Sequence, residues 1–379
     1  MQTRLAIVTG VLWLYVSLRF VWLLPGGLGF QVPLAILLLL IAEYQQFTSR
    51  WCGTMASPEL PRPWLVLLGW VFGGLLLLFL LLVARDLVGV LVWLAAPGAG
   101  IWWWTASGPA VGLGVFAALL AGWGTWQGVR VPGVKTVQLD VAGLPAVFDG
   151  YRMVQLSDLH ASRLLPAAWV SAVVTRANAL DADLVVITGD LQDGAPALRA
   201  GDVAPLARLR AHDGVLAIPG NHEYYADYRA WMTAFGQLGL AMLINAHRLI
   251  ERDGAAIAVA GVTDRQAAAF HDPPPDLEAA LAGIPTATCT VLLQHRPGSA
   301  RRNAAAGVAL QLSGHTHGGQ IVGLSELARR GNGGFVSGLY RVGAMQLYVS
   351  NGTGLWNGLL LRLGKPAEIT QLVLHPAPA

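Results

Sequence analysis

Cysteine and charge are both scarce in this sequence, and each scarcity argues against a class of protein. Only two cysteines occur in 379 residues, Cys52 and Cys289, and their spacing fits neither a zinc knuckle nor a redox pair. Charged residues make up 12% of the chain, against about 25% in an ordinary soluble protein. Runs of lysine or arginine are also missing. Neither a disulfide-built fold nor a nucleic-acid-binding protein is therefore indicated.

Histidine and lysine are absent from the first third of the chain. Residues 1–128 contain no His and no Lys but eleven of the fourteen Trp, whereas all nine His lie beyond residue 150. Apolar residues form 54% of the whole sequence, and a large share of them falls in this first third. The composition predicts two domains, a membrane-embedded one over residues 1–130 and a different one over residues 131–379.

Long apolar runs predict membrane helices, because about 20 such residues cross a hydrocarbon core. Four runs qualify, at residues 5–24, 28–42, 64–84 and 109–127. The stretch 87–104 is also apolar, but Pro97 and Gly98 interrupt it. It is either a fifth span or a re-entrant or surface segment, and the sequence leaves both open. A cleavable signal peptide over residues 1–24 is disfavoured, since no small-residue cleavage site follows it.

Basic residues predict the orientation of the four spans. Those that fall on one side are Arg4, Arg50, Arg62, Arg130 and Lys135. Only Arg85 lies clearly opposite, so the positive-inside rule favours four spans and a cytoplasmic second domain. Arg19 alone lies well inside a span, near enough to its end to reach the interface. With so little charge inside the spans, an anchor is favoured over a transporter or channel.

Residues 131–379 alternate between short β-rich runs and helical patterns, which is typical of strand–helix–strand units. The predicted strands cover residues 151–157, 183–189, 214–220, 290–294 and 308–314. The predicted helices cover residues 166–180, 196–211, 225–239, 276–283 and 298–306. Polar groups follow each predicted strand, namely Asp158 and His160, Asp190, Asn221 and His222, His295, and finally His315 and His317. Open α/β sheets place such groups on one rim, at the carboxyl ends of the strands.

The types of these side chains indicate a metal site. Carboxylate, imidazole and amide oxygen without thiolate suit Mn, Fe or Zn. Without His222, seven ligands remain, which are too many for one ion and suit two ions that share a bridge. Asp190 is the natural bridge, because a carboxylate offsets the charge of both cations. In such a site the two ions can lower the pKa of a bound water and so make it a nucleophile.

Five motifs carry a resemblance to a known family. They are SDLH (157–160), GDLQDG (189–194), PGNHEYY (219–225), LLQHRPG (292–298) and GHTHGGQ (314–320). Over residues 150–375 the sequence resembles the calcineurin-like metallophosphoesterases, and within them the membrane-associated bacterial phosphodiesterases similar to UDP-2,3-diacylglucosamine pyrophosphatases. The fold it implies is an N-terminal α-helical membrane bundle followed by an α/β (α+β) domain, a two-sheet β-sandwich flanked by helices.

The resemblance also implies a role for each motif residue. Asp158, His160 and His317 would bind one metal ion. The second ion would be bound by Asn221, His295 and His315. Asp190 would bridge both, and His222 would be the acid that meets the leaving group. Residues that bind the rest of the substrate are not indicated.

The resemblance and the apolar helices together imply a membrane-anchored hydrolase that depends on two divalent ions. Its expected substrate is a phosphodiester or pyrophosphate in a lipid or envelope precursor, and its expected location is a bacterial inner membrane with the catalytic domain in the cytoplasm. Two alternatives stay open. The substrate could be a soluble nucleotide or phosphoprotein, or the chain could be a non-catalytic membrane scaffold that keeps the fold. The sequence does not indicate an oligomeric state.

Overall fold

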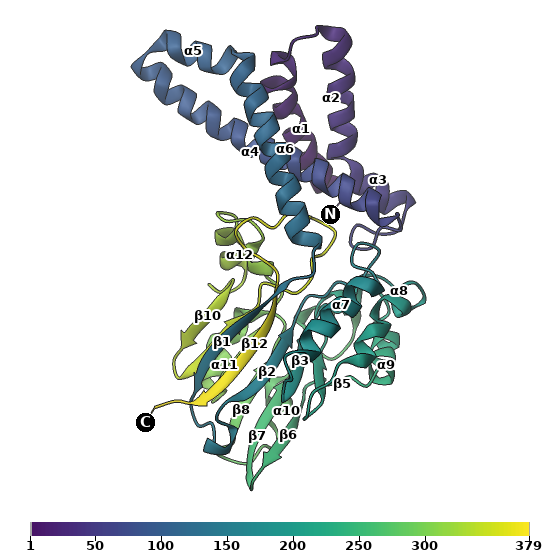
Figure 1. The fold of residues 1–379 in the computed structure, drawn as a ribbon, viewed down its shortest axis with the longest axis vertical. Coiled ribbons are helices and arrows are strands. Elements are labelled where there is room, and N and C mark those ends of the chain that lie inside the picture. Colours follow the sequence, from purple (N-terminus) through teal and green to yellow (C-terminus); the bar gives the residue numbers. More distant parts are fainter. Residues whose placement is uncertain (1, 379) are drawn as a thin grey trace. The chain divides into compact units, whose positions relative to one another are not determined.

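The computed structural model describes residues 2–378, with side chains from residue 5 onward, so the side chain of Arg4 lies outside the described part. The chain divides into two compact units (Figure 1). Met1–Gly128 and the short segment Asn357–Leu361 form the first, which we call the helical unit. Val129–Trp356 and Arg362–Ala379 form the second, which we call the sheet unit.

The helical unit is built from apolar helices with short connections. Its helices are α1 (Gln2–Arg19), α2 (Leu28–Ala42), α3 (Tyr44–Trp51), α4 (Arg62–Ala95), α5 (Pro97–Thr105) and α6 (Ser107–Val129). Three helical stretches are long and apolar enough to cross a membrane, Leu5–Leu23, α4 and α6. A fourth span results if α2 and α3, bent by 53° at their junction, count as one. The four predicted runs thus fall on α1, α2, α4 and α6.

Helix α4 is longer than the apolar run that the sequence indicates. It runs unbroken for 34 residues, whereas the predicted apolar run covers residues 64–84. The stretch 87–104 is instead divided between the last turns of α4 and helix α5. Asp86 therefore lies inside a helix, and its carboxylate is 2.7 Å from Arg19 Nε and 2.9 Å from Arg85 Nη2. Arg19 is thus paired within the helical unit.

The segment Asn357–Leu361 belongs to the helical unit although it is far from those helices in sequence. The Gln45 side chain donates a hydrogen bond to the Gly358 carbonyl over 2.5 Å. Leu360 lies directly against Gly69 of α4, where a β-carbon would collide with its side chain. Leu361 lies in the same way against Gly73. Small residues on α4 therefore make room for two leucines, which the sequence did not predict.

The sheet unit contains two six-stranded mixed sheets. The first has the order β1-β12-β2-β3-β4-β5 and the second β10-β11-β9-β8-β7-β6. The strands of the first sheet are β1 (Gly133–Val141), β12 (Glu368–Pro376), β2 (Tyr151–Leu156), β3 (Leu184–Thr188), β4 (Val215–Ile218) and β5 (Ala241–Met242). Those of the second are β10 (Gly338–Val342), β11 (Met345–Val349), β9 (Leu310–Ser313), β8 (Cys289–Leu293), β7 (Ala255–Gly261) and β6 (Ala246–Arg252). All five predicted strands are confirmed, as β2, β3, β4, β8 and β9.

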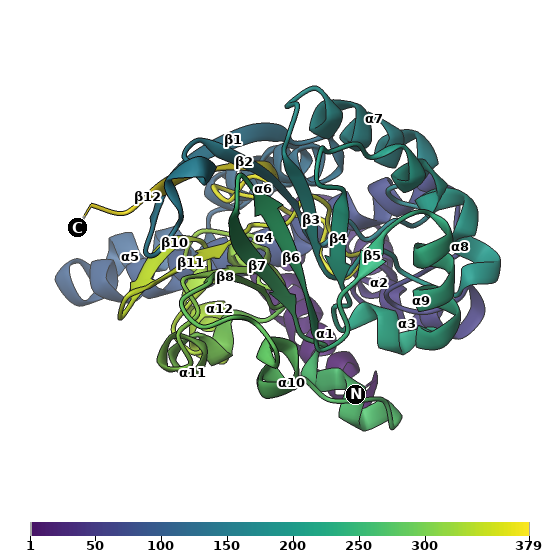
Figure 2. The ribbon, with the colours of Figure 1, turned by 90° about the horizontal axis from the view of Figure 1, so that it is seen from below.

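The core lies between the two sheets. Val186 and Leu216 of the first sheet belong to one buried cluster with Val291 and Leu312 of the second. Helices cover the outer faces, so these strands are buried on both sides and form continuous apolar runs. Figure 2 shows α7, α8 and α9 beside the first sheet and α10 and α11 beside the second. The helices of the sheet unit are α7 (Ala167–Asn178), α8 (Pro196–Val203), α9 (Tyr228–Gln237), α10 (Leu277–Leu281), α11 (Ala300–Ala305) and α12 (Ser325–Gly331).

The register of the first sheet locates the end at which the chain enters it. Strand β12 is parallel to β1, and Gly133 of β1 lies opposite Glu368. On its other side β12 is antiparallel to β2, and Gln155 of β2 lies opposite Thr370. The amino end of β1 and the carboxyl end of β2 therefore lie at the same end of the sheet. Helix α6 ends at Val129 and β1 begins at Gly133. The chain thus passes from the last apolar helix directly to the sheet end at which β2 finishes.

Candidate metal centre

The structure brings all eight predicted site residues to the carboxyl ends of five strands. Three of these strands, β2, β3 and β4, belong to the first sheet, and β8 and β9 belong to the second. Backbone hydrogen bonds tie the loops to one another: Asp158 N donates to Gly189 O and His160 N donates to Asp190 O, both over 3.0 Å. The second sheet has a similar link, from Gly314 N to His295 O over 2.9 Å. Two sheets therefore share one rim.

The backbone at this rim is strained. Twelve residues other than glycine have a positive φ among those described. Five of them are candidate metal ligands: Asp158, His160, Asp190, His315 and His317. Left-handed backbone is costly for such residues and persists where the surrounding structure enforces it, commonly at functional sites. The strain turns these side chains toward a common centre.

Two glycines allow the loops to approach closely enough for the side chains to meet. A β-carbon on Gly220 would overlap Asp190 Oδ1, and one on Gly314 would overlap Ser157 Oγ and Asp158 Oδ2. Any larger residue at either position would push a candidate ligand away from the centre. The glycines of the GNH and GHTH motifs are thus required by close packing around the carboxylates.

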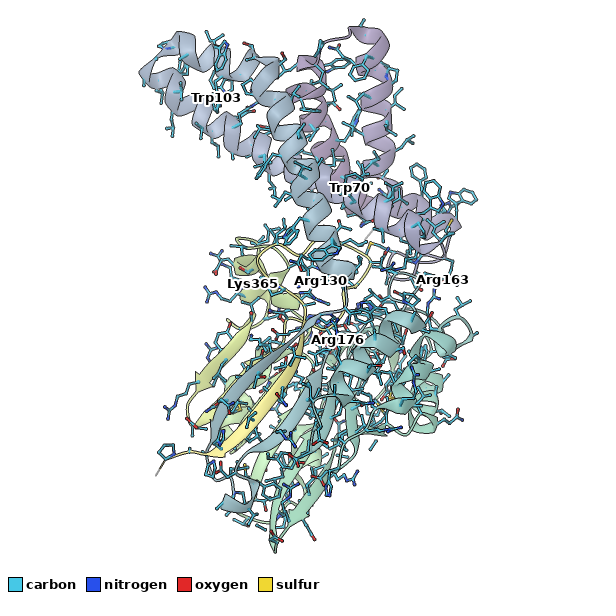
Figure 3. The ribbon with its side chains drawn as sticks, viewed as in Figure 1. Trp70, Trp103, Arg130, Arg163, Arg176 and Lys365 are labelled. Carbon is cyan, nitrogen blue, oxygen red and sulfur yellow. The ribbon has the colours of Figure 1, made fainter. Side chains whose placement is uncertain are left out.

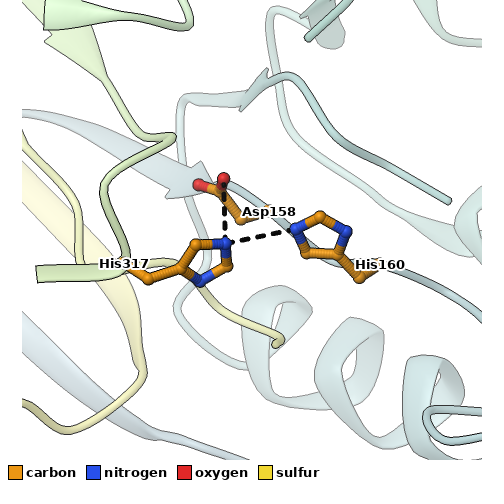
Figure 4. A group of neighbouring side chains, drawn as sticks. All are labelled: Asp158, His160 and His317. Carbon is orange, nitrogen blue, oxygen red and sulfur yellow. Dashed lines mark hydrogen bonds and ion pairs between the residues drawn. The ribbon is translucent and has the colours of Figure 1, made fainter. Parts of the chain in front are cut away.

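Asp158, His160 and His317 form the first candidate group (Figure 4). All three are buried. His160 Nε2 lies 3.2 Å from His317 Nε2, and His317 Nε2 lies 3.5 Å from Asp158 Oδ1. His160 Nδ1 lies 3.1 Å from Asp193 Oδ1, which fixes the proton on Nδ1 and leaves the Nε2 lone pair facing inward. A cation is the group that suits these converging lone pairs.

Asp190, His295 and His315 form the second group, and Asn221 lies beside them. His295 Nδ1 donates to the Thr188 carbonyl over 2.7 Å, so its Nε2 is free to bind an ion. That Nε2 lies 3.2 Å from Asn221 Oδ1 and 3.3 Å from Asp190 Oδ2. Asp190 Oδ2 is also 3.8 Å from His160 Nε2 of the first group. The donor atoms again fit a divalent ion, and Asp190 reaches both groups.

The ionisable groups of the site shift one another's pKa values. Burial opposes ionisation of Asp190, but His295 and His222 outweigh it and hold the pKa of that carboxyl well below its usual range. Burial lowers the pKa of His295, yet the Asp190 carboxylate raises it to about 10. Burial and the nearby His160 hold the pKa of His317 well below its usual range. Ionised carboxylates and a neutral His317 are the forms that bind metal, and binding would displace the proton of His295.

Asp193 is a buried residue of the site that sequence reasoning missed. Its Oδ1 accepts from His222 Nδ1 over 2.5 Å as well as from His160 Nδ1. It therefore orients both a candidate ligand and the candidate acid. Burial lowers the pKa of His222, but Asp190 and Asp193 raise it to about 9. The signal was present in the GDLQDG motif, where Asp193 follows Asp190 by three positions.

Glu223 was also missed, although it stands in the GNHE motif. Its buried carboxylate accepts hydrogen bonds from Gly220 N over 2.6 Å, Leu191 N over 2.7 Å and Asp190 N over 3.1 Å. Burial and the neighbouring Asp190 raise its pKa to about 7. Glu223 thus fastens the loop after β4 to the loop after β3, and it holds Asn221 and Asp190 at their relative positions.

Arg362 holds the backbone at His317 in place. Its guanidinium is fully buried and donates to the carbonyls of Asn351 and Gly354 over 2.8 Å and to that of His317 over 3.3 Å. Nothing in the five motifs pointed to this residue, because it lies in the closing part of the chain. Its contacts with backbone carbonyls mark it as a structural support.

Comparison with known proteins agrees with this geometry. The family model described as calcineurin-like phosphoesterase matches residues 151–319. An uncharacterised metallophosphoesterase of Helicobacter pylori is 32% identical over 70% of this chain and 70% of its own length. One from Bacillus subtilis is 34% identical over 61% of this chain and 81% of its own. The chain belongs to the calcineurin-like metallophosphoesterases.

One group of relatives also carries membrane segments. A bovine (Bos taurus) transmembrane protein with a metallophosphoesterase domain is 38% identical over 67% of this chain and 60% of its own length. A zebrafish (Danio rerio) protein of the same description is 35% identical over 69% of this chain and 62% of its own. The chain thus spans less than two thirds of the length of these relatives.

Proposed function

We propose that the protein is a membrane-anchored phosphoesterase with two metal ions that hydrolyses a phosphodiester or pyrophosphate bond in a lipid or envelope precursor. The observation that carries the proposal is the position of Asp190. Its Oδ2 atom lies within 4 Å of a histidine from each candidate group, at 3.3 Å from His295 Nε2 and 3.8 Å from His160 Nε2. One carboxylate can therefore serve two cations that sit close together.

The chain's side chains divide between the two ions. Asp158, His160 and His317 would hold one, Asn221, His295 and His315 the other, and Asp190 both. Divalent ions at these positions supply Lewis acidity and an activated water for attack on phosphorus. The donor set suits Mn, Fe or Zn, and manganese is the ion we propose to test first.

His222 would give a proton to the leaving oxygen. Asp193 holds its Nδ1, so Nε2 is the atom presented to a substrate. The His222 side chain is 12% exposed, which leaves room for contact with a ligand. The ring of Tyr225 lies 5.2 Å from the His222 ring and that of Trp356 lies 6.4 Å away, measured between ring centroids. The leaving group would therefore meet its proton donor, His222, between the aromatic rings of Tyr225 and Trp356.

The way the chain enters the sheet unit supports a substrate at the membrane surface. The candidate ligands after β2 lie at the sheet end where the chain arrives from α6. Figure 3 shows Arg130, Arg163, Arg176 and Lys365 at this same end of the sheet unit. Arg176 marks the entry point, because it donates to the Val131 and Pro132 carbonyls over 2.8 Å. Basic residues suit a surface of anionic lipids, and they agree with a cytoplasmic orientation in a bacterial inner membrane.

The test uses the full-length protein in detergent, stripped of metal and reloaded with Mn²⁺. We expect hydrolysis of a generic phosphodiester and faster hydrolysis of a lipid pyrophosphate in mixed micelles than of a soluble nucleotide. Asp190→Ala is the matched control for contaminating phosphatases. A preference for the soluble nucleotide would remove the lipid substrate, and no hydrolysis of any phosphoester by the loaded protein would leave only a scaffold.

Labelling of a single cysteine tests the orientation. Cys289 is buried, so Cys52→Ser gives a background in which a new cysteine at an exposed position, Arg302→Cys, is the reactive one. An impermeant maleimide should label it only after the cells are permeabilised. Labelling of intact cells would contradict the cytoplasmic orientation.

A further inference from the structure

Arg296 follows the candidate ligand His295 and points toward the metal centre. Its Nε donates to Asp264 Oδ2 over 2.8 Å, and its Nη1 lies 2.8 Å from His315 Nε2. Asp264 is buried, and its other carboxylate oxygen accepts from Gln266 N over 2.8 Å. Asp264 is thus a fixed support, which holds the guanidinium by one edge and leaves its far edge beside His315.

The contact between Arg296 and His315 conflicts with a metal-bound His315. A guanidinium only donates hydrogen bonds, so His315 Nε2 must accept with its lone pair. A neutral imidazole has one such lone pair in the ring plane, because its other nitrogen carries the proton. If an ion takes that lone pair at either nitrogen, the remaining nitrogen is an N–H and cannot accept. Metal loading therefore leaves Arg296 Nη1 without its acceptor.

The second terminal nitrogen of Arg296 is also uncommitted. Among residues 2–378, Asp264 and His315 are the groups to which the Arg296 side chain is hydrogen-bonded, and neither bond uses Nη2. Arg362, the other arginine at the site, differs in this respect, since backbone carbonyls accept from its terminal nitrogens. The Arg296 side chain is 16% exposed, so its free edge can meet a ligand.

We propose that Arg296 is a substrate-binding residue, which metal loading frees from His315 to hold two oxygens of the phosphoryl group. The planar fork of arginine matches paired phosphoryl oxygens. Asp264 is the positioning residue that keeps the fork directed at the centre. This inference rests on the proposed function and adds the residue that binds the phosphoryl group, whether a lipid or a soluble molecule carries that group.

The test measures the binding of inorganic phosphate to Mn²⁺-loaded full-length protein by calorimetry, together with the Mn²⁺ content and affinity of each variant. We expect Arg296→Ala to weaken phosphate binding by about 10- to 100-fold, which corresponds to the loss of charge-assisted hydrogen bonds. The phosphate affinity of Arg296→Lys should lie between those of Arg296→Ala and the unaltered protein, because lysine keeps the charge but not the planar fork of the guanidinium. Mn²⁺ affinity should stay unchanged or rise, since a cation next to His315 is removed.

Arg302→Ala is the matched control, because it removes the same charge from an exposed position of the neighbouring helix α11. It should bind phosphate like the unaltered protein. The proposal is overturned if Arg296→Ala binds phosphate as tightly as that control, or if it loses Mn²⁺ together with phosphate. The second result would make Arg296 a structural support of His315. If Arg296→Ala does not fold, Arg296→Lys and Arg296→Gln provide the same comparison.

Failure of the proposed function would look different. A loaded protein that binds phosphate through Arg296 but hydrolyses no phosphoester would contradict the enzymatic proposal and leave the role of Arg296 intact. In an active enzyme, Arg296→Ala should raise KM for both a soluble diester and a micellar one, because both present the same phosphoryl oxygens. A higher KM for the micellar substrate alone would show that Arg296 contacts the lipid headgroup and would overturn the phosphoryl assignment.

Discussion

Replacing Asp193 with asparagine should weaken metal binding and proton transfer at the same time. One oxygen of Asp193 accepts from His160 Nδ1 at 3.1 Å and from His222 Nδ1 at 2.5 Å. The amide of asparagine keeps an acceptor of similar shape but loses the charge, so neither ring is held as firmly. Because Asp193 also contributes to the raised pKa of His222, its loss makes His222 a poorer proton carrier at neutral pH.

The contact of Asp193 with His160 determines the expected loss of metal affinity, and its contact with His222 determines the expected loss of kcat. Loss of a carboxylate behind a metal-binding histidine weakens metal affinity by about 10- to 100-fold. Loss of a general acid lowers kcat by about 10²- to 10⁴-fold, and the Asp193→Asn effect through His222 cannot exceed that of His222→Asn. Metal affinity should therefore fall in Asp193→Asn but hold in His222→Asn, while kcat falls in both.

A double-mutant cycle separates these effects. The assay measures Mn²⁺ affinity and, at saturating Mn²⁺, kcat on a phosphodiester with a poor leaving group. In the His222→Asn background, Asp193→Asn should lower kcat little further and still weaken metal binding. Fully additive losses of kcat would refute the reasoning, because they would mean that Asp193 does not act through His222. Thermal unfolding of each variant checks that the fold is retained.

The remaining predictions concern the bridge, the ions and the helices. Asp190→Ala should lose metal loading and turnover together, because two cations would then repel each other without a shared carboxylate; retention of two ions, measured by mass spectrometry of the metal, would contradict the bridge. Removal of both ions by a chelator should lower the unfolding temperature of the sheet unit by about 10–20 °C if each ion was present at about 100 times its Kd; an unchanged temperature would mean that the ions bind too weakly to matter for folding. Gly69→Ala should destabilise the helical unit by about 1–3 kcal/mol relative to Gly74→Ala, because its β-carbon would collide with Leu360 whereas that of Gly74 meets nothing closer than 3.7 Å. Both changes gain the same helix propensity, so equal unfolding temperatures in detergent would mean that Leu360 does not pack on Gly69.

The sequence predicts the five strands that precede the site residues well, because the pattern that identifies each strand is local. Strands β2, β3, β4, β8 and β9 are short apolar runs, and each is followed by a polar motif. Burial on both faces makes such runs continuous, so they can be recognised without knowledge of the rest of the fold. The eight site residues follow from the same pattern, since the ends of neighbouring parallel strands meet at one rim.

The features that the sequence does not predict depend on contacts between distant residues. Asp86 and Arg19 are separated by 67 positions, so their ion pair is invisible in a hydropathy pattern. The three leucines at 359–361 read as one more apolar run, and nothing local indicates that Leu360 and Leu361 pack on glycines of α4. The left-handed backbone of Asp158 and His160 is similar, because the surrounding loops and not the residues themselves impose it.

The number of metal ions needed for activity tests the central claim most directly. Metal-free full-length protein is titrated with Mn²⁺, and bound ions per chain and hydrolysis of a phosphodiester are measured on the same samples. We predict that two ions bind per chain and that activity appears as the second site fills, because Asp190 and the two histidine groups act as one centre. Full activity with one ion per chain, or with none, would contradict the two-metal account.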